Sequence, residues 1–251
     1  MRRIDLNADV GEGYDDRALF PFLTSVNIAC GGHAGDERTM VDVVRDAAAF
    51  GLALGAHPSY PDREHFGRRE TAMRPAELGR AVREQVNALA EIAAAAGVRL
   101  AHVKPHGALY NTAARDLDIA RIVARAVGEV DPTLRLVGLG GSQLLEAGRE
   151  IGLEVAAEAF ADRRYAPDGS LAPRALDRAL IRDAEEAADQ AEHIVRGHEV
   201  VAIDGTRVRV RADTLCIHGD TDGAAAIAAA VRRRLEESGI VVARLERTRV
   251  G

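Results

Sequence analysis

The sequence contains few cysteines and no apolar run long enough to span a membrane. Its two cysteines, Cys30 and Cys216, lie in apolar, strand-like stretches. Two cysteines are too few for a disulfide framework, which favours a reducing compartment. The first residues lead directly into a predicted strand and lack the hydrophobic core of a secretory signal. We therefore expect a cytoplasmic protein without a membrane segment.

Lysine is almost absent, since Lys104 is the single lysine among 33 basic residues. With one lysine, the chain has no P-loop sequence for nucleotide binding. The net charge is −6, and the densest basic run, Arg232 to Arg234, falls near the end of a predicted helix, so nucleic acid is not an expected partner. Lysine is a compact cation with a tunable pKa, which arginine cannot replace. Lys104 is therefore a candidate functional residue, although one lysine could also survive by chance in an arginine-rich composition.

Strand patterns alternate with helix patterns along all 251 residues, which indicates an α/β fold with a mainly parallel sheet. Seven or eight such units suit an irregular (β/α) barrel of the TIM type, and a doubly wound open sheet is the alternative. We expect one domain over residues 1–251, with a β-hairpin insertion near 199–212 at Asp204-Gly205. The predicted strands lie within residues 3–13, 24–30, 52–57, 99–103, 134–139, 153–160, 215–218 and 240–245.

The first predicted strand carries an unusual polar face. Side chains alternate along a strand, so Asp5, Asn7 and Asp9 point to one side while the apolar residues between them point to the other. Buried carboxylates cost several kcal/mol unless they are paired or bound to a metal. We interpret this face as the floor of a polar site, with Glu12 just beyond it. The alternative is a solvent-facing edge strand.

Further polar residues gather at the predicted carboxyl ends of strands, which converge on one face of a barrel. Two chemistries fit them. Asp9, His57 and His106 could bind a divalent metal that activates water. Alternatively, Lys104 with Asp5 or Asp9 could perform acid–base chemistry or stabilise an oxyanion. The polar residues at these ends are Asp9, Glu12, His33, His57, Lys104, His106, Glu158, Asp162, His218 and Asp220.

Two loops are candidates for binding an anionic substrate. The turn at Gly31 and Gly32 leads into a helix whose N-cap is Asp36, and its backbone N–H groups could face an anion. Arg163 and Tyr165 lie in a loop after a predicted strand, where a guanidinium could pair with a substrate carboxylate. A solvated loop would also explain these residues.

Several long segments together resemble one family, LamB/YcsF. The resemblance covers Ile4 to about Arg174, with a further segment near Cys216, and residues 175–213 contribute little to it. The segments are D-L-N-A-D-V-G-E, N-I-A-C-G-G-H-A-G-D, G-A-H-P-S-Y-P-D, F-G-R-R, V-K-P-H-G-A-L-Y-N, E-A-F-A-D-R-R-Y and C-I-H-G-D.

This resemblance implies an irregular barrel similar to the carbohydrate-deacetylase fold. It also implies cleavage of 5-oxo-L-proline to L-glutamate, coupled to hydrolysis of ATP with Mg²⁺, in a complex with B and C subunits; a homo-oligomer is also possible. The alternatives are a stand-alone metal-dependent amidase or deacetylase, and a non-catalytic substrate-binding subunit. We expect catalytic roles for Asp5, Asp9, His33, Lys104 and His106, and substrate binding by Asn7, Glu12, Gly31, Gly32, Glu158, Arg163 and Tyr165.

Overall fold

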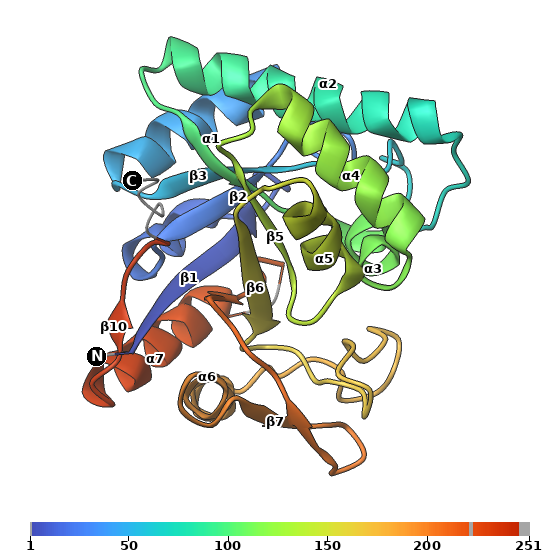
Figure 1. The fold of residues 1–251 in the computed structure, drawn as a ribbon. Helices are drawn as coiled ribbons and strands as arrows, with labels where there is room; N and C mark the ends of the chain where they lie inside the picture. Colours follow the sequence, from blue (N-terminus) through green and yellow to red (C-terminus); the bar gives the residue numbers. More distant parts are fainter. Residues whose placement is uncertain (1, 221–222, 246–251) are drawn as a thin grey trace.

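Seven parallel strands form a closed barrel in the computed structural model, which describes residues 2–220 and 223–245 (Figure 1). The ends of the expected 1–251 domain and residues 221–222 lie outside the described residues. The barrel is closed because β1 pairs in parallel with both β2 and β9, so the predicted α/β barrel is confirmed and the open sheet is wrong. The strands are β1 (Arg3–Val10), β2 (Ser25–Ala29), β3 (Ala53–His57), β4 (Leu100–Val103), β5 (Arg135–Leu139), β6 (Val155–Phe160) and β9 (Thr214–Cys216).

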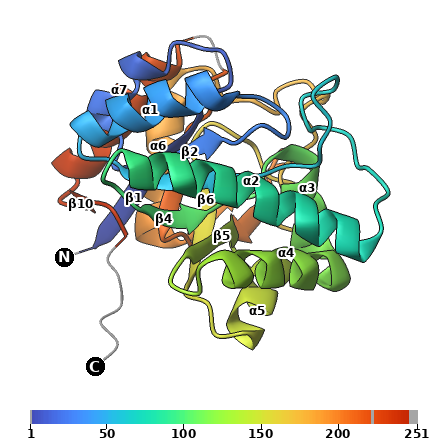
Figure 2. The ribbon, with the colours of Figure 1, turned by 90° about the horizontal axis from the view of Figure 1, so that it is seen from above.

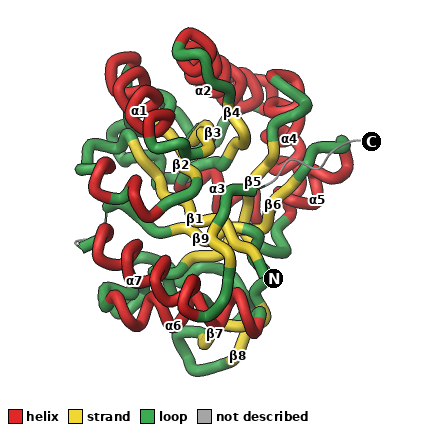
Figure 3. The backbone as a smooth tube through the Cα atoms, turned by 90° about the vertical axis from the view of Figure 1, so that its left-hand side faces the viewer, coloured by secondary structure: helices red, strands yellow, loops and turns green. Residues whose placement is uncertain are grey.

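Helices surround the strands on the outside, as the tube view in Figure 3 shows. The helices α2 and α4 lie side by side in both ribbon views (Figures 1 and 2). None of the helices in the described part of the chain combines the length and apolar composition needed to cross a membrane. The helices are α1 (Glu37–Ala49), α2 (Pro75–Ala95), α3 (Gly107–Arg115), α4 (Leu117–Val130), α5 (Gln143–Glu150), α6 (Ala184–Gly197) and α7 (Ala224–Glu237), with 3-10 turns η1 (Asp16–Ala18) and η2 (Phe20–Phe22).

Local signals explain where most helices begin. The Asp36 side chain accepts a hydrogen bond from the Thr39 N–H and caps α1, as predicted. Two expectations need correction. The helix α3 was not predicted, because its sequence was interpreted as the end of a strand and a loop. The sequence pattern after Arg174, up to about Arg196, also predicts a helix, but α6 begins only at Ala184, where Asp183 caps it.

Among the described residues, the last strand, β10 (Val241–Val242), pairs only with the beginning of β1, at Arg3 and Ile4. The predicted strand over 240–245 is therefore short and lies outside the closed ring. The chain between β6 and β9 forms a lobe beside the barrel, at the bottom of Figure 1. It contains α6 and the antiparallel hairpin of β7 (Glu199–Val201) and β8 (Arg207–Arg209), whose turn includes Asp204.

The interior of the barrel is polar. Ile4, Leu6 and Ala8 of β1 pack in the apolar core, so the alternate residues of this strand point inward. The inward residue Asp5 accepts hydrogen bonds from the hydroxyls of Thr24 (2.7 Å), Ser25 (2.7 Å) and Thr214 (2.5 Å). The edge-strand alternative is wrong, because β1 is buried and paired on both sides. The hydrogen bonds of Asp5 hold β1 in place below the site.

Candidate functional site

A cavity of about 700 Å³ opens at the carboxyl ends of the strands. Six of the residues predicted for the site line it, whereas seven others do not. Those that line it are Asp9, Glu12, His57, Lys104, His106 and Arg163. Those that do not line it are Asp5, Asn7, Gly31, Gly32, His33, Glu158 and Tyr165.

Lys104 is buried at the floor of the cavity between two carboxylates. Its Nζ lies 2.9 Å from Asp9 Oδ1, 2.9 Å from Glu158 Oε1 and 3.2 Å from Cys216 Sγ. Burial alone would lower the pKa of Lys104, but the neighbouring acidic groups, Asp9 first, raise it well above its usual value. The side chain is therefore a fixed ammonium ion.

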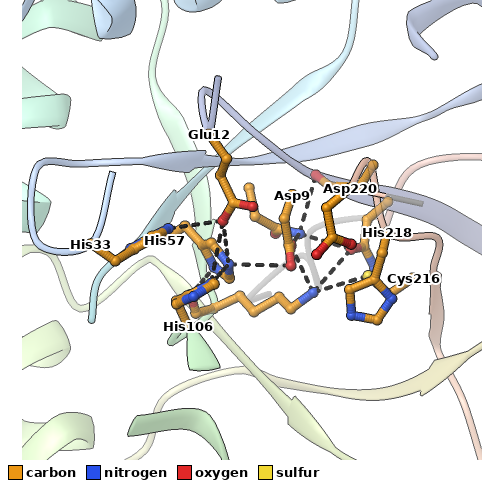
Figure 4. A network of polar contacts seen from close by, with 12 residues as sticks. Asp9, Glu12, His33, His57, His106, Cys216, His218 and Asp220 are labelled. Atoms are coloured by element: carbon orange, nitrogen blue, oxygen red, sulfur yellow. Dashed lines mark hydrogen bonds and ion pairs between the residues drawn. The ribbon is translucent and has the colours of Figure 1, made fainter. Parts of the chain in front are cut away.

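Asp9 connects this lysine to the histidines. Figure 4 shows Asp9 beside Glu12 and the histidines. Its Oδ2 lies 3.2 Å from His57 Nε2, while its Oδ1 also accepts a hydrogen bond from Asn27 Nδ2. Burial acts to raise the pKa of Asp9, but His57 and Lys104 hold it well below its usual value. Burial, together with the charge of Asp9, raises the pKa of Glu12 to about 7. Glu12 therefore keeps its proton to a higher pH than Asp9 does.

Three imidazoles and Glu12 converge on the other side of Asp9. Glu12 Oε1 lies 2.8 Å from His33 Nε2, 3.3 Å from His106 Nδ1 and 3.8 Å from His57 Nε2. The rings of His33 and His106 are stacked with centroids 3.6 Å apart. Burial lowers the pKa of His33 to about 3 and that of His106 well below its usual value, so both are neutral near pH 7.

The outer contacts of two imidazoles determine their tautomers. His57 Nδ1 lies 2.7 Å from the Lys104 carbonyl, and His106 Nε2 lies 3.0 Å from the Phe66 carbonyl. A carbonyl only accepts, so each of these nitrogens carries hydrogen and donates it. The other two nitrogens, His57 Nε2 and His106 Nδ1, then face each other, 3.0 Å apart. A shared proton or another cation is needed between them.

This donor set fits a divalent metal ion. The ligand atoms of Glu12, His33, His57 and His106 all lie within 4.8 Å of one another, and Asp9 Oδ2 is close to His57. Nitrogen and carboxylate oxygen are suitable ligands for Zn²⁺, and backbone carbonyls orient two of the imidazoles from behind. A second group, Asp9 with Cys216 and His218, does not fit, because the Lys104 ammonium already contacts both Asp9 and Cys216.

Asn7 and Glu158 complete the surroundings of Lys104. Asn7 Nδ2 donates to Glu158 Oε1 (3.1 Å) and to Thr214 Oγ1 (2.7 Å), and Glu158 is fully buried. They position the ion pairs of Lys104 and do not face the cavity.

Four predicted site residues have structural partners instead. Asp5 anchors three hydroxyls below the site, and burial raises its pKa. The Tyr165 hydroxyl accepts a hydrogen bond from the Phe160 N–H (2.8 Å), which ties its loop to β6. Gly31 has a φ of +96°, and a Cβ on Gly32 would lie 2.5 Å from Ser59 Oγ. Backbone geometry and close packing thus explain both glycines.

The structure adds residues that the sequence interpretation missed. Asn27 and His102 extend the polar interior, since His102 Nε2 lies 2.8 Å from Asn27 Oδ1. Each is a polar residue inside an apolar strand, and the same alternation that identified Asp9 could have found them. Arg68 and Arg174 also line the cavity, but they lie in irregular loops that have no predictive pattern.

The sequence model of the LamB/YcsF family matches residues 4–250. The chain is 56% identical to a Chloroflexus aggregans protein that is named as the A subunit of 5-oxoprolinase, over 96% of this chain and 98% of the relative. It is 52% identical to a protein of the same name from Methylococcus capsulatus, over 97% and 96%.

Solved structures extend the comparison. A lactam utilization protein from Thermus thermophilus superposes with a TM-score of 0.91 at 46% identity, covering 97% of this chain and 100% of that one. A polysaccharide deacetylase from Bacillus cereus superposes with a TM-score of 0.50 at 14% identity, covering 100% and 96%. The second likeness concerns the fold alone and confirms the expected similarity to carbohydrate deacetylases.

Proposed function

The chain belongs to the LamB/YcsF family, and from this premise we propose that it is the A subunit of an ATP-dependent 5-oxoprolinase. The reaction opens the lactam of 5-oxo-L-proline to L-glutamate and hydrolyses ATP to ADP and phosphate, with B and C subunits as partners. The observation that carries the proposal is the buried Lys104 ammonium, held by Asp9 and Glu158 beside the histidines at the floor of one cavity. The names of the relatives agree with it.

A five-membered lactam is a stable amide, so its oxygen must be activated before the ring can open. Transfer of the γ-phosphoryl group of ATP to that oxygen supplies the activation. Water then adds to the carbonyl carbon and gives up a proton, and the carbon–nitrogen bond breaks as the ring nitrogen accepts a proton. A second water molecule releases the phosphate. Overall, one lactam, one ATP and two water molecules yield glutamate, ADP and phosphate.

The residues of the cavity suit these steps. Lys104 places a fixed positive charge where the oxygen of the lactam or its phosphate becomes more negative. Asp9, His57 and His106 supply acceptors that orient water and receive its proton. Since the sequence has no P-loop, ATP with Mg²⁺ is bound in an unconventional way here or partly by the partner subunits.

A metal ion, if bound, would be held by Asp9, His57 and His106 with Glu12 and His33. It would supply Lewis-acid activation of water. This donor set is also the observation that favours a second function, that of a stand-alone metal-dependent amidase.

Glutamate release from 5-oxo-L-proline tests both functions. The full chain is assayed with ATP, alone and with its B and C partners, and each assay is repeated without ATP. Activity only in the mixture, dependent on ATP, is the expected result. Activity of the chain alone without ATP would overturn the proposal and support the amidase. Unchanged turnover of the complex after Asp9 and His106 are replaced would indicate a substrate-binding subunit without a catalytic role.

A further inference from the structure

Three arginines from two loops lie at the cavity wall near one aspartate, apart from the lysine and histidine contacts. Arg68 Nη2 donates to Asp220 Oδ2 at 2.7 Å, and Arg174 Nη1 donates to the same oxygen at 2.8 Å. Arg163 lies near them, on the loop that follows β6. All four side chains line the cavity.

Within the described residues, the positive charge of this cluster is only partly balanced. Arg68 and Arg174 share one carboxylate oxygen, and the acid beside Arg163, Asp162, is occupied by the backbone N–H and the ring of His218. The Arg163 side chain is buried and donates from Nη2 to the Ala172 carbonyl, and its Nε has no partner in the part of the chain that the structure describes. Burial and the nearby charge of Arg174 lower the pKa of Arg163 to about 10.

The residues that line the cavity also carry more positive than negative charge. Although the whole chain has a net charge of −6, six basic and four acidic side chains line the cavity among the described residues. Such a concave surface attracts small anions. Arg163 also lines the cavity, so its guanidinium is available to an oxyanion that enters.

We propose that Arg68, Arg163 and Arg174 form the subsite for the carboxylate of the lactam substrate, with Asp220 as the residue that positions Arg68 and Arg174. This inference rests on the proposed function, because 5-oxo-L-proline carries one carboxylate on the carbon next to its ring nitrogen. The flat guanidinium matches a flat carboxylate through paired hydrogen bonds. With the carboxylate held at the wall, the ring amide is directed to Lys104 and the histidines at the floor of the same cavity.

Calorimetric titration of the full chain tests the subsite with two ligands, 5-oxo-L-proline and the same lactam with a carboxamide in place of the carboxylate. We expect the wild type to bind the acid at least about tenfold more tightly than the amide. Arg68→Gln and Arg174→Gln should each weaken binding of the acid by about 10- to 100-fold, the range for a hydrogen bond between charged groups. Binding of the amide should stay within about twofold, because the amide lacks the charge that the arginines recognise.

Arg115→Gln is the matched control. Arg115 lines the same cavity, but its guanidinium pairs with Glu70, so its loss removes one charge without touching the cluster. We expect less than about a threefold effect on either ligand, consistent with an exposed ion pair. Asp220→Asn should weaken binding of the acid less than the arginine changes do, and thermal melting of every variant checks its folding.

Three results would overturn the subsite. The first is equal binding of acid and amide by the wild type, and the second is equal losses for both ligands in the arginine variants. The third is a wild type that shows no preference for acid over amide and from which inorganic phosphate displaces the acid only while the arginines are present. The last would assign the cluster to phosphate. The proposed function fails separately: a complex that releases no glutamate, while the chain still prefers the acid to the amide, leaves the subsite intact. In an active complex, the arginine variants should raise KM more than they lower kcat.

Discussion

The lysine side and the histidine side of the site share Asp9 but satisfy their charges differently. On the lysine side, Lys104 contacts two carboxylates, and both are fixed by asparagine side chains. On the histidine side, the inward nitrogens of His57 and His106 and the Glu12 oxygen face one another. The lysine side therefore balances its cation with its own carboxylates, whereas the histidine side is built to receive a cation or a proton.

Removing the lysine should have the largest effect. Lys104→Ala leaves Asp9 and Glu158 as buried carboxylates without a cation, and breaking such a pair costs about 3–5 kcal/mol of unfolding free energy. Glutamate release by the reconstituted complex should fall by about 10²–10³-fold, because the fixed charge at the developing anion is lost. Lys104→Arg should not restore activity, since a guanidinium is larger and planar. Full activity of Lys104→Ala would contradict the role of the lysine.

Replacing the histidines should weaken metal binding and should lower the unfolding free energy less than Lys104→Ala does. We expect the chain to bind one equivalent of Zn²⁺ or Mn²⁺, and His57→Ala with His106→Ala to weaken this binding by at least about 100-fold. Calorimetric titration and elemental analysis measure it. His193→Ala, an exposed histidine of α6, is the control. A complex with full activity after chelation and no binding of added metal would show that a proton alone joins the two imidazoles.

Asp16 sharpens the comparison, because it holds the turn that carries Glu12. Its Oδ2 accepts a hydrogen bond from the Gly11 N–H (2.7 Å), and its buried Oδ1 has no partner among the described residues. Burial raises its pKa to about 6. A raised pKa means that the folded state holds the proton more tightly, so this contribution to stability is complete below about pH 4 and is lost as the pH rises through 6.

Asp16→Asn keeps an acceptor for Gly11 and cannot ionise. Between pH 4 and pH 7, the unfolding free energy of the variant should therefore rise relative to the wild type by about 1–3 kcal/mol. Denaturant titrations at several pH values measure the difference. The neighbouring exposed residue Asp15 provides the control, Asp15→Asn. Parallel pH profiles for wild type and Asp16→Asn would show that Asp16 ionises in the folded chain as it does in the unfolded one.

The two cysteines give the smallest expected effects. Cys216 Sγ is a weak partner of Lys104, so Cys216→Ala should lower the activity of the complex by about two- to fivefold. Cys30 lies in the apolar core, and burial raises the pKa of its thiol to about 12, so Cys30→Ala should leave turnover unchanged. Equal losses in both variants would remove any special role for the sulfur next to the lysine.

The sequence predicted the frame of the molecule better than the contents of the cavity. Alternating polarity in β1 identified Asp5, Asn7 and Asp9, and strand-end positions identified Lys104, His57 and His106, because both signals are periodic or follow from chain direction. The same pattern does not distinguish Asp5, which anchors hydroxyls below the site, from Asp9, which lines the cavity. Asp5 and Asp9 differ in how deep they lie within the barrel, and alternation along a strand carries no information on depth.

The arginine cluster could not be predicted for a different reason. Arg68 and Arg174 are more than a hundred residues apart and meet at Asp220 only because three loops end at the same rim. The convergence of His33 with His106 likewise depends on the packing of two loops, and their stacked rings leave no local trace in the sequence.

The closure of the barrel has a consequence for synthesis of the protein. Strand β1 is the first of the barrel strands to be synthesised, and it pairs with β9. The Thr214 hydroxyl that bonds Asp5 is therefore synthesised more than two hundred residues later. Until then, one edge of β1 is unpaired and Asp5 lacks one of its three hydroxyl partners, and contacts so distant in sequence form slowly. A nascent chain that stops before β9 can build the helices and the first six strands, but the seam remains open. The cell thus obtains a working pocket only after β9 has been synthesised.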